Sequence, residues 1–249
     1  MPEYIHTLVA TLGGQPQVVT FTLDLLLRRN IPINEVIVVH PKPSDERLQN
    51  SLTRLAAEFV GDTYSIDGRT IRCHLRSHVL YHDGNPLEDI VNDVSANAAL
   101  NTIYRLIRDL KQQDRHIHLS VTGGRRLMAL MAISAAHLNF DHFDHIWHIY
   151  TSYAIRQEAN EGALMHLPPE AEVRLIEAPF VPWGAYFPNL VQSVDTAQDM
   201  RRSQTVHMDN QEHAKCAKVV ARATPRQVEV LKAFARGLEP QEVANELCI

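Results

Sequence analysis

The chain has 249 residues, of which 45% are hydrophobic and 21% charged, and its formal net charge at neutral pH is −5. This composition excludes a disordered chain, and the length allows one large domain or one ordinary domain with a small appendage. Because an acidic surface does not attract nucleic acid as a whole, an anionic ligand would need a local site whose field overrides the global one.

We expect a cytoplasmic protein without a membrane anchor. No apolar run approaches the roughly 20 residues that span a bilayer, and the first residues lack the basic region and hydrophobic core of a signal peptide. The cysteines Cys73, Cys216 and Cys248 lie far apart in the sequence. This spacing fits a reducing compartment and argues against structural zinc.

The first half of the sequence alternates apolar strands with helices. Alternating and β-branched runs predict strands over residues 4–11, 35–40 and 70–75. Apolar residues at helical spacing predict helices over residues 18–30, 44–59 and 87–111. Ser44 is the expected N-cap of the second helix, and Ile90 and Val94 are expected to face inward from the third.

The second half continues this alternation. A strand over 117–121 leads directly into a helix rich in Ala and Met that begins near Arg126, and further strands are expected over 144–150 and 173–176. Strands and helices in this order predict a Rossmann-like, doubly wound α/β fold with a mostly parallel sheet.

Two strand-to-helix turns each contain a pair of glycines. They are Gly13-Gly14, followed by Gln15, and Gly123-Gly124, followed by Arg125 and Arg126. Neither matches a dinucleotide fingerprint or a P-loop. Doubly wound sheets bind ligands beyond the carboxyl ends of their strands, so we expect both turns to face one pocket. Glycines at a helix N-terminus beside arginines suit phosphate, although a simple tight turn with two solvated arginines remains an alternative.

Several other side chains have both a functional and a structural interpretation. The histidines His137, His142, His145 and His148 could suggest a metal. However, residues 145 and 148 point to opposite faces of a strand, and we expect neither a metal nor a cofactor. Asn97 could contact a ligand or simply lie on a polar helix face. Thr11 could orient a ribose or cap the first helix, and Trp147 is expected in the core.

The tail has a different pattern. Residues 186–222 are expected to form a connector, with a helix near 191–202. Thr224, Pro225 and Gln227 predict a sharp helix start, and Gly237 its end. With a second helix over 240–247, residues 223–249 predict a small α-helical appendage that corresponds to half of a helix-turn-helix.

Both glycine turns resemble motifs of CARF domains, closest to the CRISPR-associated ring-nuclease branch. The stretch Ile-His-Leu-Ser-Val-Thr-Gly-Gly-Arg-Arg-Leu-Met, residues 117–128, resembles that branch's Ala-Gly-Gly-Arg-Lys-x-Met, with the family's lysine aligned with Arg126. The stretch Ala-Thr-Leu-Gly-Gly-Gln-Pro-Gln-Val-Val-Thr, residues 10–20, resembles its first turn. The resemblance implies a CARF domain over residues 1–185.

This resemblance implies a homodimer that binds cyclic oligoadenylate, above all cyclic tetra-adenylate, a messenger of type III CRISPR systems. In this family the ring's 2′-hydroxyl attacks the adjacent phosphate without a metal, which ends signalling. The implied ligand contacts, to which Asn97 is added from its helix position, are Thr11, Gly13, Gly14, Gln15, Asn97, Thr122, Gly123, Gly124, Arg125 and Arg126. The expected catalytic residues are Arg126, Arg125 and Thr11.

The tail resembles the start of a LuxR-type helix-turn-helix. Its sequence stops where the recognition helix would follow, so we expect DNA as a partner only of a longer form. Two alternatives to a ring nuclease therefore stay open. One is a non-catalytic sensor of cyclic oligoadenylate coupled to a DNA-binding helix-turn-helix, and the other is a metabolic enzyme that uses a nucleotide.

Overall fold

The computed structural model describes residues 4–168, 170–186, 213, 215–218 and 220–247. The chain divides into two compact units, residues 1–198 and 199–249, and each is described by itself. The expected helix near 191–202, and most of the expected connector, lie outside the described residues. In the described part of the chain, no helix is both long and apolar enough to cross a bilayer.

The first unit is built on a six-stranded sheet with the order β10-β9-β8-β1-β2-β5. Its strands are β1 (His6–Thr11), β2 (Ile33–His40), β5 (His74–Val79), β8 (His116–Ser120), β9 (His145–Thr151) and β10 (Val173–Glu177). All neighbours are parallel except β10, which pairs antiparallel with β9. The expected mostly parallel α/β sheet is confirmed.

The strand order reverses beside β1. The chain passes from β1 to β2 and β5 on one side, then returns to place β8 and β9 on the other. The switch point therefore lies between β1 and β8, which is where doubly wound sheets open a crevice for ligands.

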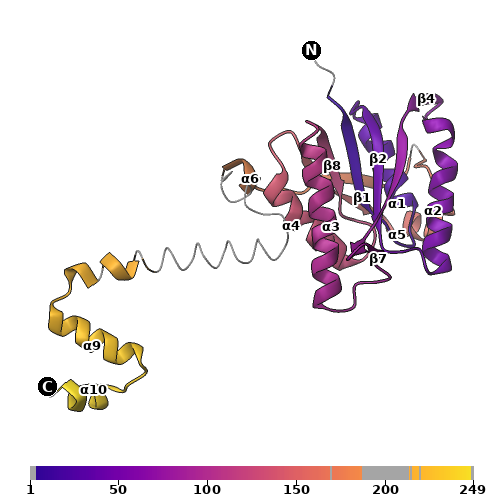
Figure 1. The fold of residues 1–249 in the computed structure, drawn as a ribbon. Helices are drawn as coiled ribbons and strands as arrows, with labels where there is room; N and C mark the ends of the chain where they lie inside the picture. Colours follow the sequence, from indigo (N-terminus) through magenta and orange to yellow (C-terminus); the bar gives the residue numbers. More distant parts are fainter. Residues whose placement is uncertain (1–3, 169, 187–212, 214, 219, 248–249) are drawn as a thin grey trace. The chain divides into compact units, whose positions relative to one another are not determined.

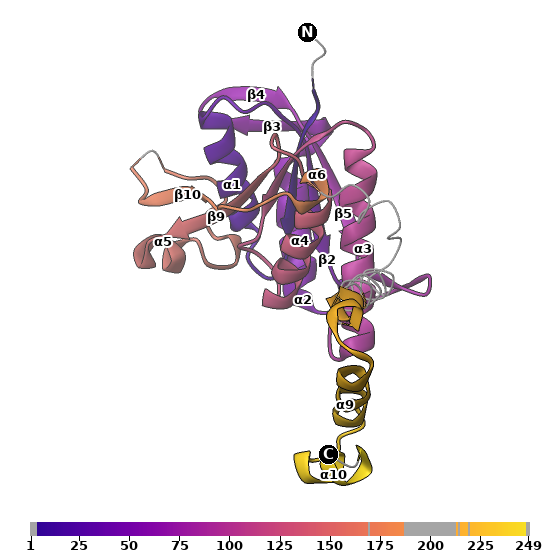
Figure 2. The same ribbon diagram turned by 90° about the vertical axis from the view of Figure 1, so that its left-hand side faces the viewer.

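Helices cover both faces of this sheet. One face carries α3 (Asp93–Lys111) and α4 (Arg126–Asn139), and the other carries α1 (Gln17–Arg28) and α2 (Glu46–Glu58) (Figures 1 and 2). Because both faces are covered, β1 is buried along Leu8, Val9 and Ala10, with Leu8 and Ala10 in the core under α1 and α2.

Smaller elements complete the first unit. They are η1 (Val60–Asp62), β3 (Thr63–Ile66), β4 (Arg69–Arg72), β6 (Tyr81–His82), β7 (Asn85–Pro86), α5 (Tyr153–Glu158), η2 (Asn160–Gly162) and α6 (Trp183–Tyr186). The pairs β3–β4 and β6–β7 form two-stranded antiparallel sheets.

The predicted start of the long helix at 87 is wrong. Helix α3 begins at Asp93, because Asn92 and Ser95 form a capping box in which each side chain bonds the other's backbone N–H. Ile90 therefore precedes the helix, and the side chain of Val94 is exposed rather than inward-facing. The apolar residues before residue 92 have helical spacing, but the cap at Asn92 starts the helix only after them.

Two further predictions need correction. The N-cap of α2 is Asp45 and not Ser44, since the Asp45 carboxylate accepts a hydrogen bond of 2.8 Å from the Leu48 N–H. The strand expected over 70–75 is two strands, with Cys73 between β4 and β5. Strand β4 pairs antiparallel with β3 to form a hairpin, which the prediction of one continuous strand over 70–75 does not contain.

In the second unit, the helix start predicted at Thr224 is confirmed. Helix α9 (Pro225–Ala235) begins with a capping box between Thr224 and Gln227, and Gly237 follows it with a φ of +84°. Helix α10 (Pro240–Leu247) packs on α9 through the buried side chains of Ala233 and Val243.

Candidate functional site

The two glycine turns lie in direct contact at the switch point between β1 and β8. A Cβ on Gly13 would lie 3.1 Å from the Cα of Gly124, and a Cβ on Gly123 would overlap the carbonyl oxygen of Thr11. Gly124 has a φ of +73°, a conformation that favours glycine. The expected convergence of the two turns is therefore present within one subunit.

Thr11 links the turns. Its side chain is buried, and its hydroxyl donates a hydrogen bond of 2.5 Å to the carbonyl oxygen of Gly123. It does not cap the first helix, because the N-cap of α1 is Pro16 and makes no side-chain hydrogen bond there. In this structure the Thr11 hydroxyl thus holds the two turns in register.

Gln15 and Thr122 connect the two turns to their neighbours, Gln15 to η2 and Thr122 to β9. The Gln15 side-chain N–H donates to the Asn160 side-chain oxygen at 2.9 Å, and its oxygen accepts from the backbone N–H of Glu161 at 3.0 Å. The Thr122 hydroxyl oxygen accepts from the backbone N–H of Ile149 at 2.9 Å. Both side chains fix the neighbouring segments against the turns.

The two arginines stand at the N-terminus of α4. Arg125 is the N-cap residue with extended backbone, and Arg126 is the first residue of this 14-residue helix. The Arg125 guanidinium bonds the Asp89 carboxylate at 2.6 Å with 60% of its side chain exposed. Arg126 is exposed and pairs with no carboxylate of the described residues. A free guanidinium and a positive helix end thus meet beside Gly124.

A third arginine at the turns was missed from the sequence. The side chain of Arg47, from α2, lies over Gly14 in the space that a Cβ would need, and its Nε pairs with Glu161 at 2.9 Å. Nothing local in the sequence connects Arg47 with the first turn. The only sequence feature that could have indicated this contact is that Arg47 is the second residue of α2, the helix that follows β2, the strand next to β1.

A cavity of about 440 Å³ opens beside the turns on the α1 side of the sheet. It is lined by Gln15, Gln17, Val18, Phe21, Thr122, His148, Ile149, Tyr150, Thr151, Arg156, Gln157, Ala159 and Asn160. Two predicted ligand residues, Gln15 and Thr122, therefore reach a hollow whose far wall is α5.

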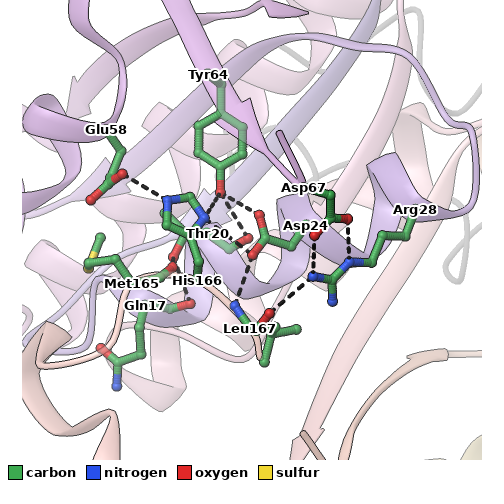
Figure 3. Close-up of polar contacts among 10 residues, drawn as sticks. All are labelled: Gln17, Thr20, Asp24, Arg28, Glu58, Tyr64, Asp67, Met165, His166 and Leu167. Carbon is green, nitrogen blue, oxygen red and sulfur yellow. Dashed lines mark hydrogen bonds and ion pairs between the residues drawn. The ribbon is translucent and has the colours of Figure 1, made fainter. Parts of the chain in front are cut away.

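The segment that follows η2 is anchored by a charge network (Figure 3). His166 lies between the Asp24 and Glu58 carboxylates, whose hydrogen bonds raise the pKa of its imidazole to about 9. The Tyr64 hydroxyl donates to Asp24 at 2.6 Å, and the backbone N–H of Leu167 donates to the same carboxylate at 3.1 Å. This network holds the chain that leads away from the cavity wall.

The remaining candidates make no hydrogen bond to the turns or lie in the core. Asn97 is a half-buried residue of α3, and no hydrogen bond connects it to either turn. Trp147 is 3% exposed, which confirms its assignment to the core. Within the described residues, no group of three His, Cys, Asp or Glu side chains could hold a metal ion.

Several histidines gather instead at the amino ends of β1, β8 and β9. The ring of His118 stacks with those of His6, His145 and Trp147, and burial lowers its pKa to about 3. A neutral, buried imidazole whose Nδ1 accepts from the Trp147 indole belongs to the core. These rings lie at the opposite edge of the sheet from the turns.

The model of one protein family, described as CRISPR-associated protein NE0113, matches residues 15–210. The chain belongs to this family. The NE0113 match begins at Gln15 and includes the whole second turn, and it ends before α9. No curated protein matches the sequence.

Solved structures similar to this NE0113-family chain share little sequence with it. Protein VC1899 from Vibrio cholerae has 14% identity and a TM-score of 0.38 over 57% of this chain and 30% of its own. Can2 from Sulfobacillus thermosulfidooxidans, solved with cyclic tetra-adenylate, has 16% identity and a TM-score of 0.33 over 57% and 31%. Csm6 from Enterococcus italicus, bound to cyclic hexa-2′-fluoro-hexa-dAMP, has 10% identity and a TM-score of 0.43 over 98% and 64%. The chain spans less than two thirds of the length of each.

Proposed function

We propose that this NE0113-family chain is a CARF-domain ring nuclease that binds cyclic oligoadenylate, foremost cyclic tetra-adenylate, across a homodimer interface. The observation that carries the proposal is the direct contact between two glycine turns at the switch point of the sheet, beside Arg125 and Arg126. These turns are the motifs by which the sequence resembles CARF domains.

The chemistry of the corner suits the phosphates of such a ring. The first backbone N–H groups of α4 have no partner within the helix, and glycine at 123 and 124 lets a phosphate approach them. A cyclic tetramer carries four phosphates, and two subunits with a formal charge of −5 each sum to −10. Two copies of Arg125 and Arg126 supply four guanidinium groups that offset this repulsion locally.

A second subunit would cover an apolar surface next to these arginines. Helices α3 and α4 lie side by side, and the Asp89–Arg125 ion pair ties their starts together (Figure 2). Four large apolar side chains there are exposed, Val91 (77%), Val94 (58%), Leu127 (40%) and Leu130 (61%). If two copies buried this surface against each other, Arg125 and Arg126 of both subunits would lie at the same interface.

Cleavage follows from holding the ring in line. A ribose 2′-hydroxyl loses its proton to water and attacks the adjacent phosphorus, and the 5′-oxygen leaves and takes up a proton from water. The products are linear with a 2′,3′-cyclic phosphate and a 5′-hydroxyl. A guanidinium offers hydrogen-bond donors and no acceptor, so Arg126 stabilises the charge of the phosphorane and does not act as a base. Arg125 contributes to the same charge stabilisation, while Thr11 keeps both turns in position.

Two observations favour a second candidate, a sensor that binds the ring without cutting it. Arginine at 126 replaces the lysine of the ring-nuclease motif, and α9 with α10 forms a capped helix pair like the start of a helix-turn-helix. In this alternative a longer form of the chain would transmit binding to DNA.

The two candidates are separated by incubating the protein with radiolabelled cyclic tetra-adenylate in the presence of a chelator. We expect linear products. A retained, uncut complex would support the sensor instead. If the ring fails to bind while mononucleotides do bind, the proposal is wrong and a metabolic nucleotide enzyme is favoured.

A further inference from the structure

Strand β5 leaves one edge of the six-stranded sheet open. It is the last strand in the order and pairs with β2, and no strand of the described part of the chain pairs with its other edge. Directly after β5, the backbone N–H of Leu80 donates to the His40 carbonyl oxygen of β2 at 2.9 Å. Because the backbone groups of successive residues point to opposite sides of a parallel strand, those of Leu75, Ser77 and Val79 point to the open edge.

A groove of about 640 Å³ lies between this edge strand and α3 (Figure 2). Its strand wall is made by Arg76 and His78, and Leu75 points to the opposite face of the sheet, where it packs on the core under α1 and α2. Its helix wall extends from Ala98 to Gln113, which is roughly 22 Å at 1.5 Å per residue. An extended segment of about seven residues has the same length.

Each wall of the groove carries an arginine that is available to an anion. On the helix wall, Arg105 is exposed and pairs with no carboxylate of the described residues. On the strand wall, the Arg76 side chain is 42% exposed, and its Nε lies 3.7 Å from the Glu35 carboxylate. Glu35 also accepts a hydrogen bond from Arg115, so one carboxylate is shared by two guanidinium groups. The charge of Arg76 is therefore only partly balanced.

The two carboxylates that line the groove offset these arginines less than their number suggests. Asp109 lies 3.6 Å from the Arg108 guanidinium and forms an ion pair with it. Asp83 lies on the turn between β6 and β7, where its side chain is 89% exposed to solvent that screens its charge. The groove therefore suits a segment that brings its own carboxylates.

We propose that β5 and α3 form a docking groove for an extended acidic segment of a partner protein, which adds a strand to the open edge of β5. Its backbone bonds the outward-facing groups of Leu75, Ser77 and Val79, and its alternate side chains point into the groove. Carboxylates on those side chains pair with Arg76 and Arg105. Since β5 is separated from β1 by β2, this site is distinct from the glycine turns and does not depend on ring binding.

A second copy of this chain fits the same edge less well. Two β5 strands paired antiparallel with Ser77 at a twofold axis would place the Arg76 side chains of both copies on the same face, diagonal to each other. Like charges in such a position are destabilising, whereas a carboxylate in the added strand is favourable. The charge of the groove therefore favours an acidic segment over self-pairing.

The test measures the fluorescence polarisation of a labelled peptide, Ser-Val-Glu-Val-Glu-Val-Ser, during titration with the full chain. We expect this peptide to bind at least 10-fold more tightly than its analogue with lysine in place of glutamate. Arg105→Ala should weaken binding by about 10-fold, as for one lost hydrogen bond between charged groups. Arg174→Ala is the matched control, because Arg174 is an exposed arginine on β10 at the opposite edge of the sheet.

Ser77→Pro tests strand addition itself. Proline removes an N–H that points to the open edge and leaves the hydrogen bonds to β2 in place, so it should lower affinity at least 10-fold. Ser77→Ala is its control. Both variants lose the hydrogen bond of 2.6 Å between the Ser77 hydroxyl and His40, but the alanine variant keeps the edge N–H and should bind like the wild type. Equal unfolding temperatures show that the two variants are folded alike.

Several results would overturn this inference. Failure of the acidic peptide to bind, or equal binding of both peptides, would show that the groove does not select an acidic segment. Binding that is lost in Arg105→Ala but retained in a folded Ser77→Pro chain would show that an anion binds without strand addition. Self-association that is lost in Ser77→Pro, without peptide binding, would show that the edge pairs with a second copy instead. If Ser77→Pro does not fold, the comparison of Arg105→Ala with Arg174→Ala decides.

Discussion

At the scale of single residues, the contact between Gly123 and Thr11 makes the two turns one unit. A side chain at 123 has no space, because its Cβ would overlap the Thr11 carbonyl oxygen. The hydroxyl of the same threonine donates to the Gly123 carbonyl, so backbone and side chain fix this position together. Both motifs could be predicted from the sequence because each is a contiguous run.

Gly123→Ala should lower the free energy of unfolding by about 1–3 kcal/mol, because the turns must move apart to admit the methyl group. Ring binding should be lost as well. Gly13→Ala is the graded control, since its Cβ would lie 3.1 Å from the Gly124 Cα and demands a smaller shift. Urea denaturation and titration with cyclic tetra-adenylate measure both effects. Equal stability of wild type and Gly123→Ala would show that the turns do not pack as described.

Arg126→Ala should lower the cleavage rate by about 100-fold, as expected when one donor to a developing negative charge is removed, and should lower affinity much less. The exposed Arg174, on β10, provides the control Arg174→Ala. Single-turnover cleavage and equilibrium binding separate the two quantities. Unchanged turnover would remove Arg126 from the catalytic role.

The residues that the sequence did not reveal come from distant segments. Arg47 reaches the first turn from α2, and Gln157 reaches the cavity from α5. Tertiary packing alone brings such side chains to the turns, and neither belongs to a motif. Contiguous motifs predict the centre of a site, whereas its rim depends on how whole elements pack.

At the scale of elements, local hydrogen bonds decided boundaries that periodicity could not. The Asn92–Ser95 capping box starts α3 well after the apolar pattern begins, and the Asp45 carboxylate displaces Ser44 as the cap of α2. The limits of α9, by contrast, were predicted from Thr224 and Gly237, and the structure has the Thr224 cap and a positive φ at Gly237. Strong turn residues therefore predicted boundaries better than apolar spacing did.

The segment behind the cavity should be held less firmly at alkaline pH. Hydrogen bonds from the His166 imidazole to the Asp24 and Glu58 carboxylates raise the pKa of His166 from 6.5 to about 9, so the folded state binds its proton more tightly than the unfolded state. This contribution to stability is complete below pH 6.5 and is lost as the pH rises through about 9. Because the imidazole is 39% exposed, solvent screening reduces the effect.

Urea denaturation of the wild type and of His166→Gln at pH values across this range measures the contribution. We expect the wild type to lose more stability than the variant between the two pKa values. His118→Gln is an informative comparison, since burial lowers the His118 pKa to about 3 and keeps its imidazole neutral throughout the range. Parallel pH profiles for wild type and His166→Gln would contradict the assignment.

At the scale of the whole molecule, the alternation of strands and helices predicted the fold class, but not the strand order. Order depends on which strands pair across the sheet, and the placement of β8 beside β1 is a long-range contact without a local signal. The antiparallel edge strand β10 was likewise predicted as a strand without its direction. The switch point therefore required the structure.

Leu130→Glu should convert the proposed dimer into monomers and abolish ring binding, because a charge in the α3–α4 apolar surface would be buried without a partner. Val60→Glu is the control. Val60 is 72% exposed on η1, away from that surface, and its substitution should leave the dimer intact. Sedimentation velocity measures the outcome. A Leu130→Glu chain that remains dimeric would place the interface elsewhere.

The central claim is that the joined glycine turns of two subunits form a single seat for one ring. Isothermal titration of the wild-type chain with cyclic tetra-adenylate, in the presence of a chelator and at a temperature where cleavage is slow, tests it most directly. The account predicts one ring bound for every two chains, with this binding lost in Gly123→Ala. One ring bound per chain, or no heat of binding at all, would contradict it.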